Sequence, residues 1–255
     1  LFSLLRKRKR FDMETSQFYT ACVASAFTYL HERKIAYRDL KPENVLIQRD
    51  GHVCISDFGL SKPGVNHPLR GARSMCGTPE YLAPEILRGS HEHGLAVDSW
   101  CLGALFYELL EGYPPWFTKD KKKLLERVAR RDLELKLPRG LKPKLSKDGE
   151  LCLRALLHRD ATVRLGSDGD AQAVKDHPCF GMVDFQGLAM RHVDPPFLPT
   201  RFVADLRSDE EVLWSDVKVD ADRKLQRMDI SDDRFDEIFA KFEYRGERDV
   251  LLEEA

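Results

Sequence analysis

The chain has 255 residues, of which 42% are hydrophobic and 33% are charged. This length suits one large or two small domains, and this composition excludes disorder as the default state. The net charge is only −1, but residues 200–255 hold 17 acidic and 10 basic side chains, and the rest of the chain holds 31 basic and 25 acidic ones. We therefore expect any anionic partner to bind the first 199 residues.

The six cysteines lie far apart in the sequence, without a CxxC pair or a metal-ligand spacing. This distribution favours free thiols in a reducing compartment. No run of about 18 apolar residues is present, so we expect no membrane span. These features predict an intracellular protein, located in the cytoplasm or the nucleus.

The first part of the chain predicts a helix followed by a hairpin. Apolar residues recur at helical spacing between about residues 15 and 33, which predicts an amphipathic helix. Residues 45–47 and 53–55 are short apolar runs on either side of turn residues at 49–51. This pattern favours a β-hairpin.

The middle of the chain predicts a long loop and a central helix. Residues 61–80 are rich in Gly, Pro, Ser and Arg and lack periodicity, so we expect a loop with a functional role. Residues 97–110 are almost all apolar, which is typical of a helix buried on all sides. Further helices are expected at residues 121–131 and 148–158, and the body should close near Phe180.

The stretch YRDLKPENVLI at residues 37–47 contains the residue types that phosphoryl transfer requires. The reaction needs a carboxylate to orient the attacking hydroxyl, oxygen ligands for magnesium and a cation near the transferred phosphate. Asn44 follows Asp39 by five positions, and Asp57 follows Asn44 by 13, where the hairpin can bring it back. With Ala83-Pro84-Glu85, these residues match the catalytic-loop, DFG and APE signatures in order and spacing. Residues 1–180 thus resemble the eukaryotic protein kinase family.

The resemblance implies an α+β, mainly helical fold and an enzyme that uses ATP and Mg²⁺. By this resemblance Asp39 is the catalytic base, Lys41 contacts the γ-phosphate, and Thr78 hydrogen-bonds near both. Asn44 and Asp57 are the implied magnesium ligands. The other positions implied for ATP binding are Leu1, Leu46 and Ser56. The alternative is that Asp39 and Asp57 are structural charges in a loop.

The motifs are most similar to those of AGC-group serine/threonine kinases, the relatives of protein kinases A, B and C. LKPEN, with Lys41, resembles the serine/threonine-directed kinases, and Tyr37 replaces the usual histidine, as is common in this group. DFGLSK and CGTPEYLAPE indicate the same group. The resemblance gives Tyr37, Phe58 and Asp98 a structural role in the internal packing column and its anchor on the central helix.

Ser74 occupies the position where AGC kinases carry the activating phosphorylated residue. A phosphate would add roughly −1.5 to −2 charges there. Arg38 and Lys62 are the implied cationic partners. The alternative is an unmodified loop serine.

Two acidic positions indicate the substrate class. Glu43 and Glu108 match the AGC positions that bind arginine upstream of the target residue, since a carboxylate can accept two bonds from a guanidinium. The alternative for both is a solvated surface. The family's pocket for the substrate residue that follows the phosphorylated one is resembled by four residues, Met75, Cys76, Pro79 and Leu82. Glu85 and Arg164 match a structural ion pair of the family.

The C-terminal segment resembles the AGC extension only in part. FAKFEY at residues 239–244 resembles the hydrophobic motif, with Glu243 in the position that is usually phosphorylated. An ordinary amphipathic helix explains the same spacing. No proline follows Pro199, so the usual Ser/Thr-Pro site is missing.

The sequence contains no glycine-rich phosphate loop and no strand with the Val-Ala-Ile-Lys signature, both of which hold ATP in protein kinases. LFSLLRK at the start resembles the segment directly after the hinge between the two lobes. We therefore expect residues 1–180 to form the large lobe and residues 181–255 the extension, with the small lobe absent and little transfer by this chain alone. The alternative function is a catalytically silent, kinase-like interaction module.

The expected partners are protein substrates with basic residues upstream of Ser or Thr, and an upstream activating kinase. RKRKR at residues 6–10 could be a nuclear-localisation or nucleic-acid patch, but basic runs at helix ends are more often solvated. We expect no nucleic-acid partner.

Overall fold

The structure is a computed structural model that describes residues 1–199 except 89–91, 131, 138–139, 142–144 and 168–171. Residues 200–255 lie outside the described residues, and so do the predictions for residues 239–244 and Glu243. Leu1–Pro199 forms one unit by its internal contacts. This unit includes residues 181–199, the start of the expected extension.

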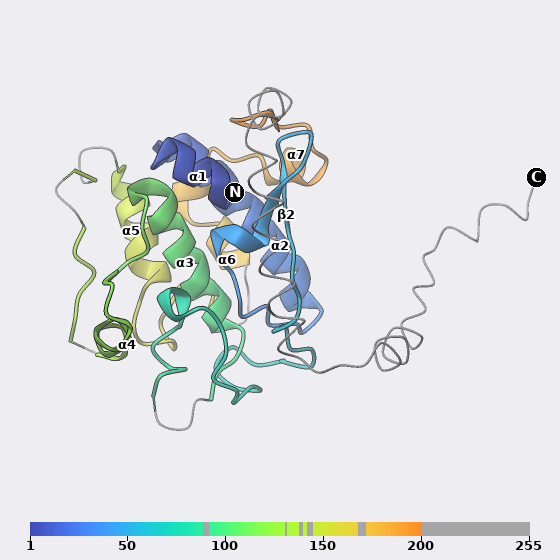
Figure 1. Ribbon diagram of the computed structural model, residues 1–255. Helices are drawn as coiled ribbons and strands as arrows, with labels where there is room; N and C mark the ends of the chain where they lie inside the picture. The colour runs from blue at the N-terminus through green and yellow to red at the C-terminus, as the bar shows by residue number, and fades with distance from the viewer. Residues whose placement is uncertain (89–91, 131, 138–139, 142–144, 168–171, 200–255) are drawn as a thin grey trace, which may run out of the picture. The chain divides into compact units, whose positions relative to one another are not determined.

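Two long helices form the centre of this unit. Helix α2 (Met13–Glu32) begins at Asp12, whose carboxylate accepts a 2.8 Å hydrogen bond from the backbone N–H of Thr15. Helix α3 (Ala96–Glu111) packs against α2, and all of its residues except Glu108 and Glu111 are buried. The predicted central helix, buried on all sides, is therefore confirmed (Figure 1).

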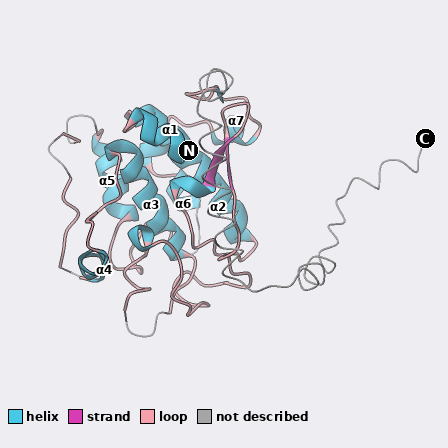
Figure 2. Cartoon of the chain, viewed as in Figure 1, coloured by secondary structure: helices cyan, strands magenta, loops and turns pink. Residues whose placement is uncertain are grey.

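A hairpin packs against α2, as the sequence predicts. Strands β1 (Val45–Ile47) and β2 (Val53–Ile55) are antiparallel, with Val45 opposite Ile55. Among the described residues they form a two-stranded sheet, and the rest of the regular structure is helical (Figure 2). The described part of the chain is therefore mainly helical with a small β component, as expected.

The remaining elements are short and surround the central pair. The helices are α1 (Phe2–Arg8), α4 (Lys121–Ala129), α5 (Lys147–Leu156), α6 (Gln172–Lys175) and α7 (Phe185–Ala189). The single 3₁₀ turns are η1 (Pro42–Asn44), η2 (Pro79–Tyr81) and η4 (Pro178–Phe180). The two further predicted helices thus correspond to α4 and α5, within two residues at each end.

The end of α3 requires a glycine. Gly112 has φ of 90°, in the left-handed region, and its N–H donates to the carbonyl of Glu108 at 2.7 Å. A Cβ at this position would lie 2.1 Å from the carbonyl oxygen of Lys9. The missing side chain therefore lets the segment after α1 pass directly beside the end of α3.

Across the described ranges, no helix combines the length and the apolar character needed to cross a bilayer. All six cysteines are free thiols, as the sequence spacing predicts.

Candidate active site

The loop before the hairpin is held by a buried carboxylate of α3. Asp98 is fully buried, and it accepts hydrogen bonds from the backbone N–H of Tyr37 at 2.9 Å and of Arg38 at 2.8 Å. It also bonds to Nε2 of His31 at 2.8 Å. Arg38 has φ of 70°, a strained value for a side chain other than glycine, and the Asp98 bond holds it there.

The next residue, Asp39, is the centre of a polar cluster. Its Oδ2 accepts from Nζ of Lys41 at 3.0 Å and from Nδ2 of Asn44 at 3.1 Å, and its Oδ1 accepts from Oγ1 of Thr78 at 3.0 Å. Nζ of Lys41 lies 3.3 Å from Oγ1 of Thr78. The structure thus brings together Asp39, Lys41 and Thr78 with the implied metal ligand Asn44, although Thr78 is 39 positions from Asp39. Both carboxylate oxygens of Asp39 therefore accept hydrogen bonds within the cluster.

The hairpin returns the chain to this cluster. The backbone N–H of Ser56 donates to the carbonyl of Asn44 at 2.9 Å, and its Oγ donates to the same carbonyl at 3.1 Å. Asp57, the next residue, is exposed with φ of 58°, and its Oδ1 accepts from the N–H of Gly59 at 3.1 Å. Asn44 and Asp57 therefore lie at the same end of the hairpin, because the residue next to Asp57 is bonded to the backbone of Asn44.

These two side chains fit a magnesium ion by their chemistry. Mg²⁺ prefers oxygen ligands, usually one or two from the protein with the rest from phosphate and water. Nδ2 of Asn44 is committed to Asp39, so the amide oxygen points away from that carboxylate. An amide oxygen and a carboxylate at the edge of an exposed surface suit a cation shared with a phosphate ligand.

The positions implied for ATP lie around the hairpin. The backbone nitrogen of Leu1 donates to the carbonyl of Val45 at 2.7 Å, which places Leu1 beside β1. Leu46 follows the buried Val45 on β1, and its side chain is 47% exposed. Phe58, 50% exposed, stacks its edge on Tyr37 with ring centroids 5.4 Å apart. Leu46 on β1 and Phe58 after β2 therefore each present an apolar side chain to solvent.

The expected phosphorylation site lies against one of its two implied partners. Oγ of Ser74 accepts a 2.7 Å hydrogen bond from Nη1 of Arg38, whose Nε donates to the carbonyl of Leu60 at 2.8 Å. Lys62 pairs through its backbone with Ala36. In the described part of the chain, no recorded interaction joins the Lys62 side chain to Ser74.

The expected arginine-binding carboxylates lie in an acidic cluster. The hydroxyl of Tyr81 donates to Oε2 of Glu108. Burial raises the pKa of Glu108 to about 7; the Tyr81 bond opposes the rise, and the nearby charges of Glu43 and Glu80 add to it. Glu43 and Glu108 are thus close enough for the charge of one to affect the pKa of the other. Within the described residues, no cationic side chain is seen to pair with Glu108.

The residues expected to form the pocket for the substrate side chain after the phosphorylated residue differ in their exposure. Pro79 begins η2, and Leu82 follows it with 6% exposure. Met75 is 55% exposed, and Sγ of Cys76 lies 3.7 Å from Oγ of Ser74. Leu82 therefore belongs to the core, and Met75 presents an apolar side chain to solvent.

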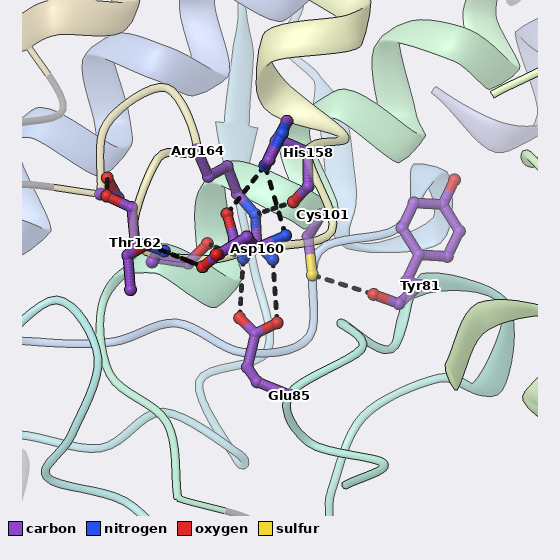
Figure 3. Close-up of polar contacts among 9 residues, drawn as sticks. Tyr81, Glu85, Cys101, His158, Asp160, Thr162 and Arg164 are labelled. Carbon is purple, nitrogen blue, oxygen red and sulfur yellow. Dashed lines mark hydrogen bonds and ion pairs between the residues drawn. The ribbon is translucent and has the colours of Figure 1, made fainter. Parts of the chain in front are cut away.

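A buried ion pair fixes the segment that follows. Nη1 and Nη2 of Arg164 donate to the two carboxylate oxygens of Glu85 at 2.7 and 2.8 Å (Figure 3). The Arg164 side chain is fully buried and also donates to the carbonyls of His158 and Ala96, each at 2.9 Å. Burial opposes ionisation of Glu85, but the charge of Arg164 and its paired hydrogen bonds hold the pKa of Glu85 below its usual value. This is the structural pair that the sequence motif predicts.

Sequence reasoning did not assign roles to three residues of the site. Tyr81 and Glu80 lie within the quoted CGTPEYLAPE motif, so their positions were visible, but their relation to Glu108 depends on the fold. His31 lies at the end of the predicted first helix, and nothing local indicates its bond to Asp98, 67 positions away.

Comparison with known proteins agrees with this geometry. The family model "Protein kinase domain" matches residues 1–180. The chain is 43% identical over 201 residues to "Serine/threonine-protein kinase Sgk2" of Homo sapiens, and 39% identical over 200 residues to "Serine/threonine-protein kinase Sgk1" of Bos taurus. It is 42% identical over 199 residues to "Protein kinase 2" of Dictyostelium discoideum. The chain therefore belongs to the protein kinase domain family, and its predicted likeness to AGC-group serine/threonine kinases is confirmed.

Each of these alignments covers 78% of this chain, but only 52%, 44% and 40% of the respective relative. The chain thus spans about half or less of the length of these relatives.

We expect Glu85→Gln to lower the free energy of unfolding by about 3 kcal/mol at neutral pH, because Arg164 would remain buried without a counter-charge. The folded pKa of Glu85 is depressed, so its contribution is present above the ordinary value of 4.5 and is lost as the pH falls below it. The difference between wild type and variant should therefore shrink in acid. Urea unfolding at several pH values measures this.

The matched control is Asp132→Asn, which removes a carboxylate from the exposed pair with Arg130. It should change stability much less, because solvent screens that pair. Equal losses for the two variants would contradict a structural role for the Glu85–Arg164 pair.

Proposed function

We propose that this chain carries the catalytic and substrate-binding part of a serine/threonine protein kinase, which transfers the γ-phosphoryl group of ATP to a protein hydroxyl. The observation that supports this most is the cluster of Asp39, Lys41, Asn44 and Thr78 on a loop held by Asp98. Positioning of such groups is the main requirement of this chemistry, and the hydrogen bonds within the cluster support it.

Each side chain of the cluster has a distinct role in the proposed mechanism. Asp39 orients the attacking hydroxyl of the substrate and accepts its proton. Lys41, held by Asp39 and Thr78, places a cation beside the transferred group. Asn44 and Asp57 would hold Mg²⁺, which would neutralise phosphate charge there. The proposed transfer also needs the groups that hold the ATP phosphates in protein kinases, a glycine-rich loop and a strand lysine.

The proposed substrates have arginine upstream of the target residue. Glu43, Glu80 and Glu108 form a region of negative potential beside η2, which supports recognition of a guanidinium. A protein kinase that phosphorylates Ser74 is the proposed regulator, because Arg38 already contacts the Ser74 hydroxyl.

We expect Asp39→Asn to lower kcat by about a hundredfold or more, because the amide cannot accept the substrate proton. The measurement is transfer from ATP to an arginine-containing peptide by the chain joined to a protein kinase small lobe. The chain alone should show little transfer. Asp50→Asn, a change at an exposed carboxylate paired with Arg191, is the control and should keep full activity.

Failure of the joined protein to transfer phosphate, with peptide binding intact, would favour the silent interaction module instead. Equal activity of Asp39→Asn and wild type would exclude Asp39 as the base.

Phosphorylation of Ser74 should raise kcat/KM by about tenfold, because a phosphate would strengthen the hydrogen bond that Arg38 already donates to the Ser74 hydroxyl. Ser74→Ala should abolish the gain. Arg73→Gln alters the neighbouring guanidinium, which is exposed and 3.5 Å from Glu92, and it should preserve the gain. An activity that is high and independent of Ser74 would remove this switch.

The affinity for arginine-containing peptides should depend on pH. Because the pKa of Glu108 is about 7, this carboxyl is mostly protonated in mild acid and must lose its proton to pair with arginine. We expect KM to fall about tenfold between about pH 6 and pH 8. Glu108→Gln should remove both this dependence and the preference for an arginine peptide over its glutamine analogue. A pH profile that survives in Glu108→Gln would assign the titration to another group.

A further inference from the structure

Two buried thiols lie next to each other outside the proposed active site. Cys152 belongs to α5 and is fully buried, and Cys179 belongs to η4 and is 5% exposed. The two residues are 27 positions apart in the chain, and α5 packs against η4. The thiol of Cys152 donates a hydrogen bond to the sulfur of Cys179, so the two sulfur atoms are neighbours in the core. The proposed kinase function gives no role to this pair.

A second donor reaches the sulfur of Cys179. Nε2 of Gln17, on α2, donates to the carbonyl of Cys179 at 2.6 Å and to its Sγ at 3.8 Å. The sulfur of Cys179 thus accepts from two groups, whereas the thiol of Cys152 is itself a donor. Packing alone does not require this arrangement, because an apolar side chain at position 179 would fill the core without accepting from either group.

These hydrogen bonds make the two thiols chemically different. The bond from Cys152 lowers the pKa of the Cys179 thiol below its usual value; burial and the charge of Asp148 oppose this effect, and the bond from Gln17 adds to it. The same bond raises the pKa of the Cys152 thiol, and burial raises it further. Since the thiolate is the nucleophile in thiol chemistry, we expect Cys179 to react first.

Cys179 also lies closer to solvent than Cys152. It follows Pro178, which is exposed, and it lies two residues before Gly181, which is exposed as well. Cys152 has no exposed surface. A small oxidant that approaches the η4 turn therefore meets Cys179 before Cys152.

The other cysteines provide a contrast. Sγ of Cys101 donates to the carbonyl of Tyr81 at 3.3 Å rather than to a thiol, and burial raises the pKa of Cys22 to about 12. Within the described residues, which include all six cysteines, the bond from Cys152 to Cys179 is the one hydrogen bond seen between two thiols.

We propose that Cys152 and Cys179 form a reversible disulfide on exposure to hydrogen peroxide, with Cys179 as the attacking thiol and Cys152 as the resolving one. In the first step, the thiolate of Cys179 attacks one oxygen of the peroxide. An S–O bond forms, the O–O bond breaks, and the released hydroxide combines with the proton that Cys179 has lost. The product is a sulfenic acid on Cys179 and one water.

In the second step, the sulfur of Cys152 attacks the sulfur of Cys179. The S–S bond forms, the S–O bond breaks, and the leaving hydroxide takes the Cys152 proton as a second water. The two sulfurs together lose two electrons, and the peroxide gains them. A small thiol such as glutathione reverses the modification by thiol–disulfide exchange.

The test is oxidation of the full chain by a small molar excess of hydrogen peroxide, followed by blocking of free thiols with N-ethylmaleimide, digestion with trypsin and mass spectrometry. Trypsin cleaves after Lys and Arg, so it places the two cysteines in separate peptides of residues 148–154 and 176–191. We expect these peptides to be joined after oxidation and separate again after treatment with dithiothreitol. The joined peptide is the readout rather than the intact mass, because the fully exposed Met182 also takes up oxygen.

Variants test the role of each thiol. Cys152→Ala should remove the joined peptide and leave a sulfenic acid on Cys179, which dimedone labels. Cys179→Ala should leave Cys152 unmodified. Cys101→Ala is the matched control, since it also truncates a buried cysteine of the core, and it should leave the yield of the joined peptide unchanged.

Thermal unfolding checks that each variant is folded, and the digest of the wild-type chain decides the proposal even where a variant does not fold. Absence of the joined peptide in the oxidised wild type would overturn the proposal, and so would a joined peptide that forms only in urea. A bond between Cys179 and a different cysteine would also contradict it. The measurement needs no phosphoryl transfer, so its result is independent of the proposed kinase activity.

Discussion

The carboxylate of Asp98 determines where the rest of the site lies. A fully buried charge is costly unless donors surround it, and here two backbone amides and His31 supply them. Because the amides belong to Tyr37 and Arg38, compensation of the charge fixes the backbone directly before Asp39. The hydrogen bonds that stabilise the buried Asp98 therefore also fix the position of Asp39.

The same helix organises both ends of the site. Near its first turn, α3 offers Asp98 to the catalytic loop and the carbonyl of Ala96 to Arg164. Near its last turn it presents Glu108 to Tyr81. The loop segment of residues 74–85 is thus attached at several points, through Arg38, Asp39, Glu108 and Arg164. A rigid, almost fully buried helix is suited to this, because its side chains cannot shift without opening the core.

The sequence was sufficient for the parts whose signal is local. Hydrophobic periodicity located α2, an almost continuous apolar run located α3, and the turn residues between two apolar runs located the hairpin. The spacing of Asp39, Asn44 and Asp57 indicated the site because the intervening turn and hairpin are short. Short elements with little periodicity, such as α6 and α7, were not predicted, because four or five residues carry too weak a pattern.

The relations that depend on long-range packing could not be read from the sequence. The bond between His31 and Asp98 joins residues 67 positions apart. The pKa of Glu108 is about 7 because the side chain is buried and lies near Tyr81, Glu43 and Glu80, which the fold brings together. The role of Lys62 beside a phosphorylated Ser74 stays a prediction, since the backbone of Lys62 pairs with Ala36 and the position of its side chain next to a phosphate cannot be read from the motif.

The bond between Arg38 and the unmodified Ser74 hydroxyl has a consequence for regulation. A switch can shift an equilibrium only by the difference in interaction energy between its two states. Since Arg38 already contacts the serine, a phosphate would strengthen an existing bond rather than create one from a separated pair. The unmodified loop therefore already has the Arg38 contact that a phosphorylated loop would use. The increase in activity on phosphorylation would be limited by the fraction of molecules that adopt this arrangement before modification.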